Sequence, residues 1–306
     1  MRIFLTGCTG FIGSHVLQSL YRQGHKITCL VRKCSKKKLL SYLTADEFAT
    51  GDRINIIEAE WTKPEDWLNY VAGHETVINT VGIIREKHHG DFDTVHHRVP
   101  VALFEQSANS NVNRIIQISA MGSDEQATSK FHISKREADT YLAGQKIPHT
   151  VIRPAFVYGN GASSMAFFTQ LAALPITPVP GDGQYYVQPI HINDLIKAII
   201  ITIERNDLRS IIVDAGGGEI LTFDRMLDIL GNQLGKPVNH LHIPWNVIEL
   251  VAKVTDFFGG HGPITTEELY MLKRGNFSDT RKFVEFFGFE PLKFSEGIAL
   301  SRPVTK

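Results

Sequence analysis

The sequence predicts an α/β protein in which a Rossmann-type, doubly wound parallel sheet is joined to a smaller, discontinuous C-terminal lobe. Three observations predict this fold. Short apolar segments alternate with helical stretches through the first half of the chain, as in βαβ units. A glycine-rich turn over residues 7–13 stands between the first apolar segment and a helical stretch at 14–22. After about Gly159 the alternation weakens, and loops rich in glycine and proline appear at 174–183 and 216–218.

Six segments are predicted to form the strands of the main sheet. Their apolar residues are mostly Ile, Val and Leu, as expected for parallel strands that helices cover on both faces. The segments are 2–6, 26–31, 53–59, 76–80, 114–119 and 149–153. A further strand-like segment, 211–215, can return to this sheet. We therefore predict a dinucleotide-binding domain of residues 1–158 plus about 189–215, and a smaller lobe of about 159–188 plus 216–306.

Composition limits where the protein acts and what it binds. The 306 residues contain 32 basic and 32 acidic side chains, so no overall charge draws the chain to nucleic acid. The cysteines, at 8, 29 and 34, suit a reducing compartment. Glycines interrupt the N-terminal apolar run that a signal peptide needs, and the longest aliphatic stretch, 199–203, is too short to span a bilayer. We expect a cytoplasmic protein without a transmembrane segment.

The segment Thr6 to Gly13 is the strongest chemical signal. Gly7 permits a tight turn, Gly10 lets the backbone approach a pyrophosphate, and Gly13 lets the helix pack closely on the strand. The phosphates then lie on the helix N-terminus, with Thr9, Phe11 and Ile12 completing the loop. A flexible turn is the alternative, but the strand before the loop and the helix after it favour a dinucleotide.

The end of the second predicted strand favours NADP(H) over NAD(H). NAD-binding chains usually carry Asp or Glu there, which hydrogen-bonds the ribose 2′-hydroxyl. This chain has Arg32 and Lys33 instead, and their positive charge suits a 2′-phosphate. The alternative is a solvated basic run, since Lys36 to Lys38 continue it.

Several motifs together resemble the extended or atypical short-chain dehydrogenase/reductases, a family that includes NAD-dependent epimerases and dehydratases. They are the glycine loop and residues 79–82, 131–135, 151–159 and 189–195. Segments 81–86, 118–122 and 274–276 resemble the branch that contains the NADPH-binding accessory subunit of respiratory complex I and its bacterial relatives.

The resemblance implies further cofactor contacts. Glu60 and Trp61 would lie beside the adenine, and Lys135 would hydrogen-bond the nicotinamide ribose. For Val81 and Val157 core packing is an equally good interpretation. The remaining expected contacts are Thr80, Val81 and Gly82 under the ribose, and Pro154, Ala155, Phe156 and Val157 around the nicotinamide.

The candidate catalytic residues depart from the family pattern. Active members have a Tyr four residues before the Lys, whose ammonium lowers the phenol pKa; here Phe131 precedes Lys135. Ser119 is the candidate partner hydroxyl, although Ala120 and Met121 follow it. Other candidate donors have ordinary structural roles as their alternative; they are Ser123, His132, Ser134, Tyr141 and Tyr158.

The histidines at 88, 89, 96 and 97 lack the spacing of known metal motifs, so we predict no metal site, and His96 is expected to bond the backbone. Segment 245–258 is predicted to be a helix with a wide apolar face. Such a face either covers the protein's own core or docks onto a respiratory or quinone-related partner or a membrane surface.

Two functions remain open from the sequence. The first is an NADP(H)-binding protein without turnover, which supports a respiratory or quinone-related assembly or senses its redox state. The second is an NADP-dependent oxidoreductase, epimerase or dehydratase on a small organic or quinone-like substrate. It would use Lys135 and an unconventional proton donor.

Overall fold

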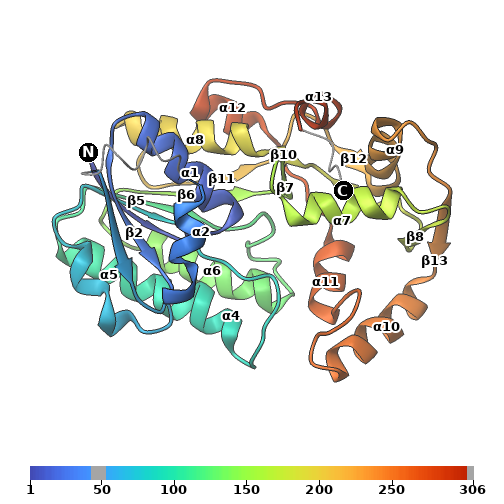
Figure 1. Cartoon of the computed structure of the whole chain (residues 1–306), viewed down its shortest axis with the longest axis horizontal. Coiled ribbons are helices and arrows are strands. Elements are labelled where there is room, and N and C mark those ends of the chain that lie inside the picture. The colour runs from blue at the N-terminus through green and yellow to red at the C-terminus, as the bar shows by residue number, and fades with distance from the viewer. Residues whose placement is uncertain (43–52, 302–306) are drawn as a thin grey trace. The chain divides into compact units, whose positions relative to one another are not determined.

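A seven-stranded sheet forms the centre of the first of two units in the computed structural model, which describes residues 1–42 and 53–301 (Figure 1). The strand order is β11-β6-β5-β4-β1-β2-β3, and every pairing from β6 to β3 is parallel. The chain crosses from β3 to β4, on the other side of β1, so the topological switch point lies beside β1. The predicted Rossmann-type sheet is confirmed.

The predicted strands agree closely with those observed, and the segment 211–215 joins the sheet as β11, next to β6. The elements that lie wholly or mostly in the first unit are β1 (Arg2–Thr6), α1 (Phe11–Arg22), β2 (Lys26–Val31), η1 (Lys33–Ser35), α2 (Lys36–Leu40), β3 (Ile54–Glu58), η2 (Pro64–Asp66), η3 (Leu68–Val71), β4 (Thr76–Asn79), α4 (Asp91–Asp93), η4 (Thr94–Arg98, a π-helical turn), α5 (Val99–Asn109), β5 (Arg114–Ile118), α6 (Lys130–Ala143), β6 (His149–Pro154), α8 (Ile192–Glu204) and β11 (Ile211–Ala215).

Helices cover both faces of the sheet, with α4, α5 and α6 on one side and α1 and α8 on the other (Figure 1). The apolar residues of β1, β4 and β5 are buried accordingly. One hydrophobic cluster contains Phe4, Trp67 and Phe104, all fully buried. This burial is the main force that holds the unit together.

The second unit consists of residues 154–195 and 214–306. It combines helices with three two-stranded sheets, β10-β7, β12-β9 and β13-β8. Its elements are β7 (Val157–Tyr158), α7 (Ser163–Ala172), β8 (Thr177–Pro180), β9 (Tyr186–Val187), β10 (Ile190–His191), β12 (Leu221–Thr222), α9 (Phe223–Gln233), β13 (His240–Ile243), α10 (Trp245–Phe257), α11 (Thr266–Arg274), α12 (Arg281–Phe287) and α13 (Phe294–Leu300). The division into functional domains that the sequence suggests, with 154–158 and 189–195 in the dinucleotide-binding part, stays a prediction.

Helices α10 and α11 pack on each other around a small core of their own. Ile248, Ala252 and Leu269 are buried there, with Trp245 and Ile264 packed against them. Among the helices that the structure describes, none combines the length and the apolar character needed to cross a bilayer.

Candidate cofactor and active site

The glycine loop after β1 has no room for side chains at two of its glycines. Gly7 adopts a positive φ of 77°, and its carbonyl accepts a hydrogen bond from the Gly10 amide at 2.9 Å. A side-chain carbon on Gly13 would lie 2.2 Å from that same carbonyl oxygen, and one on Gly7 would lie 2.7 Å from the Thr80 carbonyl carbon. The close packing of loop, α1 and β4 therefore requires glycine at both positions.

The loop leaves the start of α1 open to an anion. Gly10 is the N-cap and supplies no side-chain hydrogen bond, so the amides of the first turn of α1 lack a side-chain cap. Unsatisfied amides and the helix dipole both favour a phosphate at this point. The residues present thus fit the pyrophosphate of a dinucleotide.

A buried polar ladder crosses three strands beneath the loop. Thr6 donates its hydroxyl hydrogen to Asn79 Oδ1 at 2.6 Å, and Asn79 donates from Nδ2 to Gln117 Oε1 at 2.8 Å. Asn79 Oδ1 also accepts from the Val81 amide at 3.1 Å, and Thr80 donates its hydroxyl hydrogen to the Thr6 carbonyl at 2.7 Å. These bonds orient residues 80–82 beside the loop. Our sequence analysis missed Thr6 and Gln117; their signal is a polar residue near the end of an otherwise apolar strand.

Arg32 and Lys33 follow β2 directly, close to the glycine loop. In the sheet Leu30 pairs with Thr6, so Arg32 lies just beyond the strand ends. Arg32 and Lys33 are exposed, and neither forms an ion pair with another residue that the structure describes. Lys36, by contrast, forms a salt bridge of 2.7 Å with Glu58. Within the described residues, the charges of Arg32 and Lys33 are therefore not used in an ion pair.

Glu60 and Trp61, both expected beside the adenine, lie in different environments. Glu60 is exposed. Trp61 is buried, donates its indole hydrogen to the Val95 carbonyl at 3.2 Å, and stacks on Trp67 with ring centroids 5.1 Å apart. The Trp61 side chain is thus part of the hydrophobic core, and the places of Glu60 and Trp61 beside the adenine stay predictions.

Lys135 is a buried ammonium on α6, with 5% of the residue exposed. The helix begins at Lys130 because the Ser129 hydroxyl caps the His132 amide. A side-chain carbon on Gly82 would lie 3.6 Å from Lys135 Nζ and 3.7 Å from His96 Nε2, so these groups meet at residue 82. Burial lowers the pKa of Lys135 to about 8, against the opposing attraction of Asp139.

Phe131 occupies the space one helical turn before Lys135. Its ring centroid is 5.5 Å from Lys135 Nζ, which gives a cation–π contact, and its edges meet Phe92 and His96. The ring therefore fills the tyrosine position while offering no exchangeable proton.

His96 bonds the backbone, as the sequence analysis expects. Its Nε2 accepts from the Ile83 amide at 3.0 Å, so Nδ1 carries the proton and faces Ser134 Oγ at 3.2 Å. Burial, and then the charge of Lys135, lower the pKa of His96 to about 2. His96 is consequently a neutral structural group at physiological pH.

Ser119 lies at the end of β5 and belongs to a buried ion-pair network. It donates to Asp139 Oδ2 at 2.8 Å, and Arg153 Nε donates to the same oxygen at 2.8 Å. Burial raises the pKa of Asp139, while Arg153 opposes this shift. The hydroxyl proton of Ser119 is thus held by a carboxylate, and its catalytic role stays a prediction.

The other candidate donors occupy separate environments. Ser134 bonds His96 and the Phe131 carbonyl, and His132 bonds Ser129. Ser123 is buried, and its hydroxyl has no partner among the described residues. Tyr141 donates to Glu105, on the outside of the unit. Ser134, His132 and Tyr141 are thus each bonded to other groups, and a role for any of these donors beside Lys135 stays a prediction.

Residues Pro154 to Val157 begin the second unit. The Ala155 amide donates to the Ala215 carbonyl at 2.9 Å, and the Phe156 amide donates to Asn276 Oδ1 at 2.7 Å. Val157 pairs with Ile190 in the β10-β7 sheet, and Tyr158 is buried. Their predicted place around a nicotinamide stays a prediction, as do the other expected cofactor contacts.

Comparison with known proteins supports the cofactor interpretation. The model of a family described as NAD(P)H-binding matches residues 7–172. A mitochondrial NADH dehydrogenase [ubiquinone] 1 alpha subcomplex subunit 9 from Dictyostelium discoideum is 24% identical over 226 residues, which are 73% of this chain and 61% of that protein. A ceramide reductase from Caulobacter vibrioides is 24% identical over 65% of this chain and 59% of its own length. The chain thus spans about 60% of these relatives.

A solved structure extends the fold match to the whole chain. The UDP-glucose 4-epimerase of Thermotoga maritima, solved with UDP-glucose, superimposes with a TM-score of 0.75 and 20% identity, over 98% of this chain and 97% of the epimerase. At this identity the match shows a shared fold.

Proposed function

The chain belongs to the NAD(P)H-binding family, with the fold of the epimerase/dehydratase-like short-chain dehydrogenase/reductases, and from that premise we propose a specific role for it. It binds NADP(H) and does not catalyse the tyrosine-dependent dehydrogenation of active members. It acts as a cofactor-binding support or redox sensor for a respiratory or quinone-related assembly. A complex I subunit among its relatives is consistent with that setting.

Phe131 carries this proposal. In an active site of this type a phenol one turn from Lys135 would transfer the proton, with its pKa lowered by the buried ammonium. The Phe131 ring contacts that ammonium but has no hydroxyl. A placed acid or base typically contributes about 10²–10⁴-fold in rate, so its loss reduces turnover by that order.

The cofactor assignment rests on the glycine loop and on Arg32. NADP(H) would supply hydride transfer when bound. The chain's own contribution is binding: the start of α1 holds the pyrophosphate, Arg32 and Lys33 hold the 2′-phosphate, and Lys135 holds the ribose near Gly82.

A second candidate function is NADP-dependent reduction, epimerisation or dehydration of a small organic or quinone-like substrate. One observation favours it: a pKa of about 8 lets the Lys135 ammonium give up a proton near neutral pH. A ceramide reductase among the relatives is consistent with this alternative.

The exposed face of α10 supports docking onto a protein of the assembly. Val247, Leu250, Val254, Phe257 and Phe258 are all exposed, Phe257 to 85%, although the opposite face of the helix is buried on α11. A hollow of about 340 Å³ lies beside these side chains and is lined by residues between Leu250 and Pro263. A hollow next to exposed apolar side chains suits a protruding side chain of a partner protein; a membrane surface is the alternative outcome.

Turnover measurements with three proteins test the function. We expect wild type to show no NADPH consumption with carbonyl, enone or quinone compounds. We also expect denaturation of the purified protein to release NADP(H), which mass spectrometry would detect. Phe131→Tyr restores the phenol and is expected to gain slow turnover. Robust wild-type turnover that survives Lys135→Met would exclude both the proposed role and the lysine-based alternative.

A further inference from the structure

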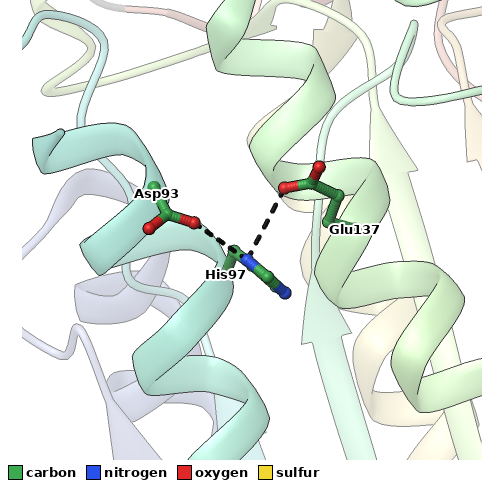
Figure 2. A group of neighbouring side chains, drawn as sticks. All are labelled: Asp93, His97 and Glu137. Carbon is green, nitrogen blue, oxygen red and sulfur yellow. Dashed lines mark hydrogen bonds and ion pairs between the residues drawn. The ribbon is translucent and has the colours of Figure 1, made fainter.

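Two carboxylates and one imidazole from two neighbouring helical segments point toward one another (Figure 2). Asp93 ends α4, His97 lies in the π-helical turn η4, and Glu137 lies on α6. His97 Nδ1 is 2.9 Å from Asp93 Oδ1 and 3.5 Å from Glu137 Oε2, and all three ligand atoms lie within 4.8 Å of one another. Each side chain is partly exposed, so an ion and water can reach the group.

A single imidazole nitrogen faces both carboxylates. One N–H group can form a good hydrogen bond to Asp93, but Glu137 at 3.5 Å lies beyond the usual range for a second. Around a tetrahedral zinc ion, bonds of about 2.0–2.2 Å place neighbouring ligand atoms about 3.3–3.6 Å apart. The 3.5 Å separation of His97 and Glu137 lies in this range, and the hydrogen-bonded Asp93 oxygen at 2.9 Å would have to move away from His97 by roughly half an ångström. The geometry therefore accommodates a shared cation after a small movement of Asp93.

Arg98 holds the remaining oxygen of one carboxylate. Its Nε lies 2.9 Å from Asp93 Oδ2, which leaves Asp93 Oδ1 directed at His97. Ligating carboxylates are commonly held in this way by a second hydrogen bond.

We propose that Asp93, His97 and Glu137 form a binding site for one Zn²⁺-type divalent cation, with water as the remaining ligand. One imidazole and two carboxylates are a ligand set that such ions accept. The sequence analysis predicts no metal site because known metal motifs have ligands at short, fixed spacings in the chain. Such motifs cannot detect this group of residues, because Glu137 lies on a different helix from His97.

Binding at this site would join η4 to α6. His96 directly precedes His97, and Lys135 lies two residues before Glu137. A cation here would hold together the two elements whose side chains His96 and Lys135 meet at Gly82. This role does not depend on whether the protein turns over a substrate.

Isothermal titration of the untagged, chelator-treated full chain with ZnCl₂ tests the proposal. We expect one Zn²⁺ per chain, and an affinity at least about tenfold lower in His97→Ala and in Glu137→Gln. The matched control is His242→Ala, because His242 also pairs with a carboxylate, at 2.9 Å from Asp224 Oδ2. This control should bind Zn²⁺ as wild type does, and a large excess of Mg²⁺ should not compete.

Amide hydrogen exchange supplies a second readout that does not depend on affinity. Zn²⁺ should slow exchange in 94–98 and 130–143 of wild type but not of His97→Ala, whose unchanged circular dichroism would show that it folds. Equal Zn²⁺ affinity in wild type and His97→Ala, loss of binding in His242→Ala alone, or no binding to wild type would each overturn the proposal.

Discussion

At the scale of single residues, the buried ammonium of Lys135 is the least ordinary feature. Burying a charge is costly, and here the ring of Phe131 lies against the ammonium, with its centroid 5.5 Å from Nζ. Asp139, one turn further along α6, is bound by Ser119 and Arg153. The burial of Lys135 is therefore expected to lower native-state stability.

The pKa of Lys135 predicts how that cost varies with pH. The folded pKa of about 8 lies below the ordinary value of 10.5, so between these values the unfolded chain binds more protons and stability rises with pH. At about 1.4 kcal/mol per pH unit, the free energy of unfolding of wild type relative to Lys135→Met rises by up to about 3 kcal/mol across this interval. Denaturant unfolding from about pH 7 to 10.5 measures it, with Lys130→Met on the same helix as control. If the difference in free energy of unfolding between wild type and Lys135→Met did not change with pH, the lowered pKa of Lys135 would be contradicted.

Arg32 predicts the cofactor preference. A charge-assisted hydrogen bond contributes about 1.5–3 kcal/mol, so NADPH should bind roughly ten- to a hundredfold more tightly than NADH. Arg32→Ala should remove most of this preference. Lys36→Ala is the matched control, because the salt bridge to Glu58 already uses that charge. Fluorescence titration with both cofactors measures this preference. A preference for NADPH that persists in Arg32→Ala would show that another group binds the 2′-phosphate.

At the scale of elements, α10 shows how one helix can serve two purposes. Its buried face, with Ile248 and Ala252, packs on α11 and holds the pair together. Its other face is exposed and carries five apolar side chains, Val247, Leu250, Val254, Phe257 and Phe258. Stability alone does not require such a face, since exposed positions contribute little to folding.

The docking prediction follows from these two faces. The triple variant Val247→Asp, Val254→Asp, Phe258→Asp should keep the wild-type thermal midpoint within a few degrees but lose association with its partner. Cross-linking in cells followed by mass spectrometry should join wild-type Lys253 to a respiratory subunit, and Asn246→Asp should behave as wild type. Flotation of wild type with liposomes would point to a membrane surface instead, and a strongly destabilised triple variant would mean that the face belongs to the core.

At the scale of the whole molecule, the expected cofactor contacts fall in both units. The loop, Arg32, residues 80–82 and Lys135 belong to the first, and residues 154–157 to the second. A ligand that binds only the native state stabilises it by mass action, by about 2.7 kcal/mol at a hundredfold excess over its Kd.

Amide hydrogen exchange with and without NADPH tests whether both units contact the cofactor. We expect slower exchange in residues 7–14, 80–83 and also 155–157. NADH at the same concentration should give weaker protection. Protection confined to the first unit would remove 154–157 from the predicted nicotinamide pocket.

The sequence by itself determined the sheet and the loop, because both depend on short-range features. Strand segments are runs of Ile, Val and Leu, and all seven strands of the main sheet begin and end within one residue of the predicted positions. Gly7 and Gly13 are recognisable because only glycine tolerates the required backbone and the close approach. The replacement of tyrosine by Phe131 is likewise visible at a single position.

Only the tertiary structure decided how distant side chains are used. The strand pairing brings Thr6, Asn79 and Gln117 into one ladder, and packing between helices places Glu137 beside His97. Trp61 became a core residue because Trp67 and the Val95 carbonyl surround it. Most of these partners are dozens of residues apart in the chain, and no local pattern encodes which of them meet.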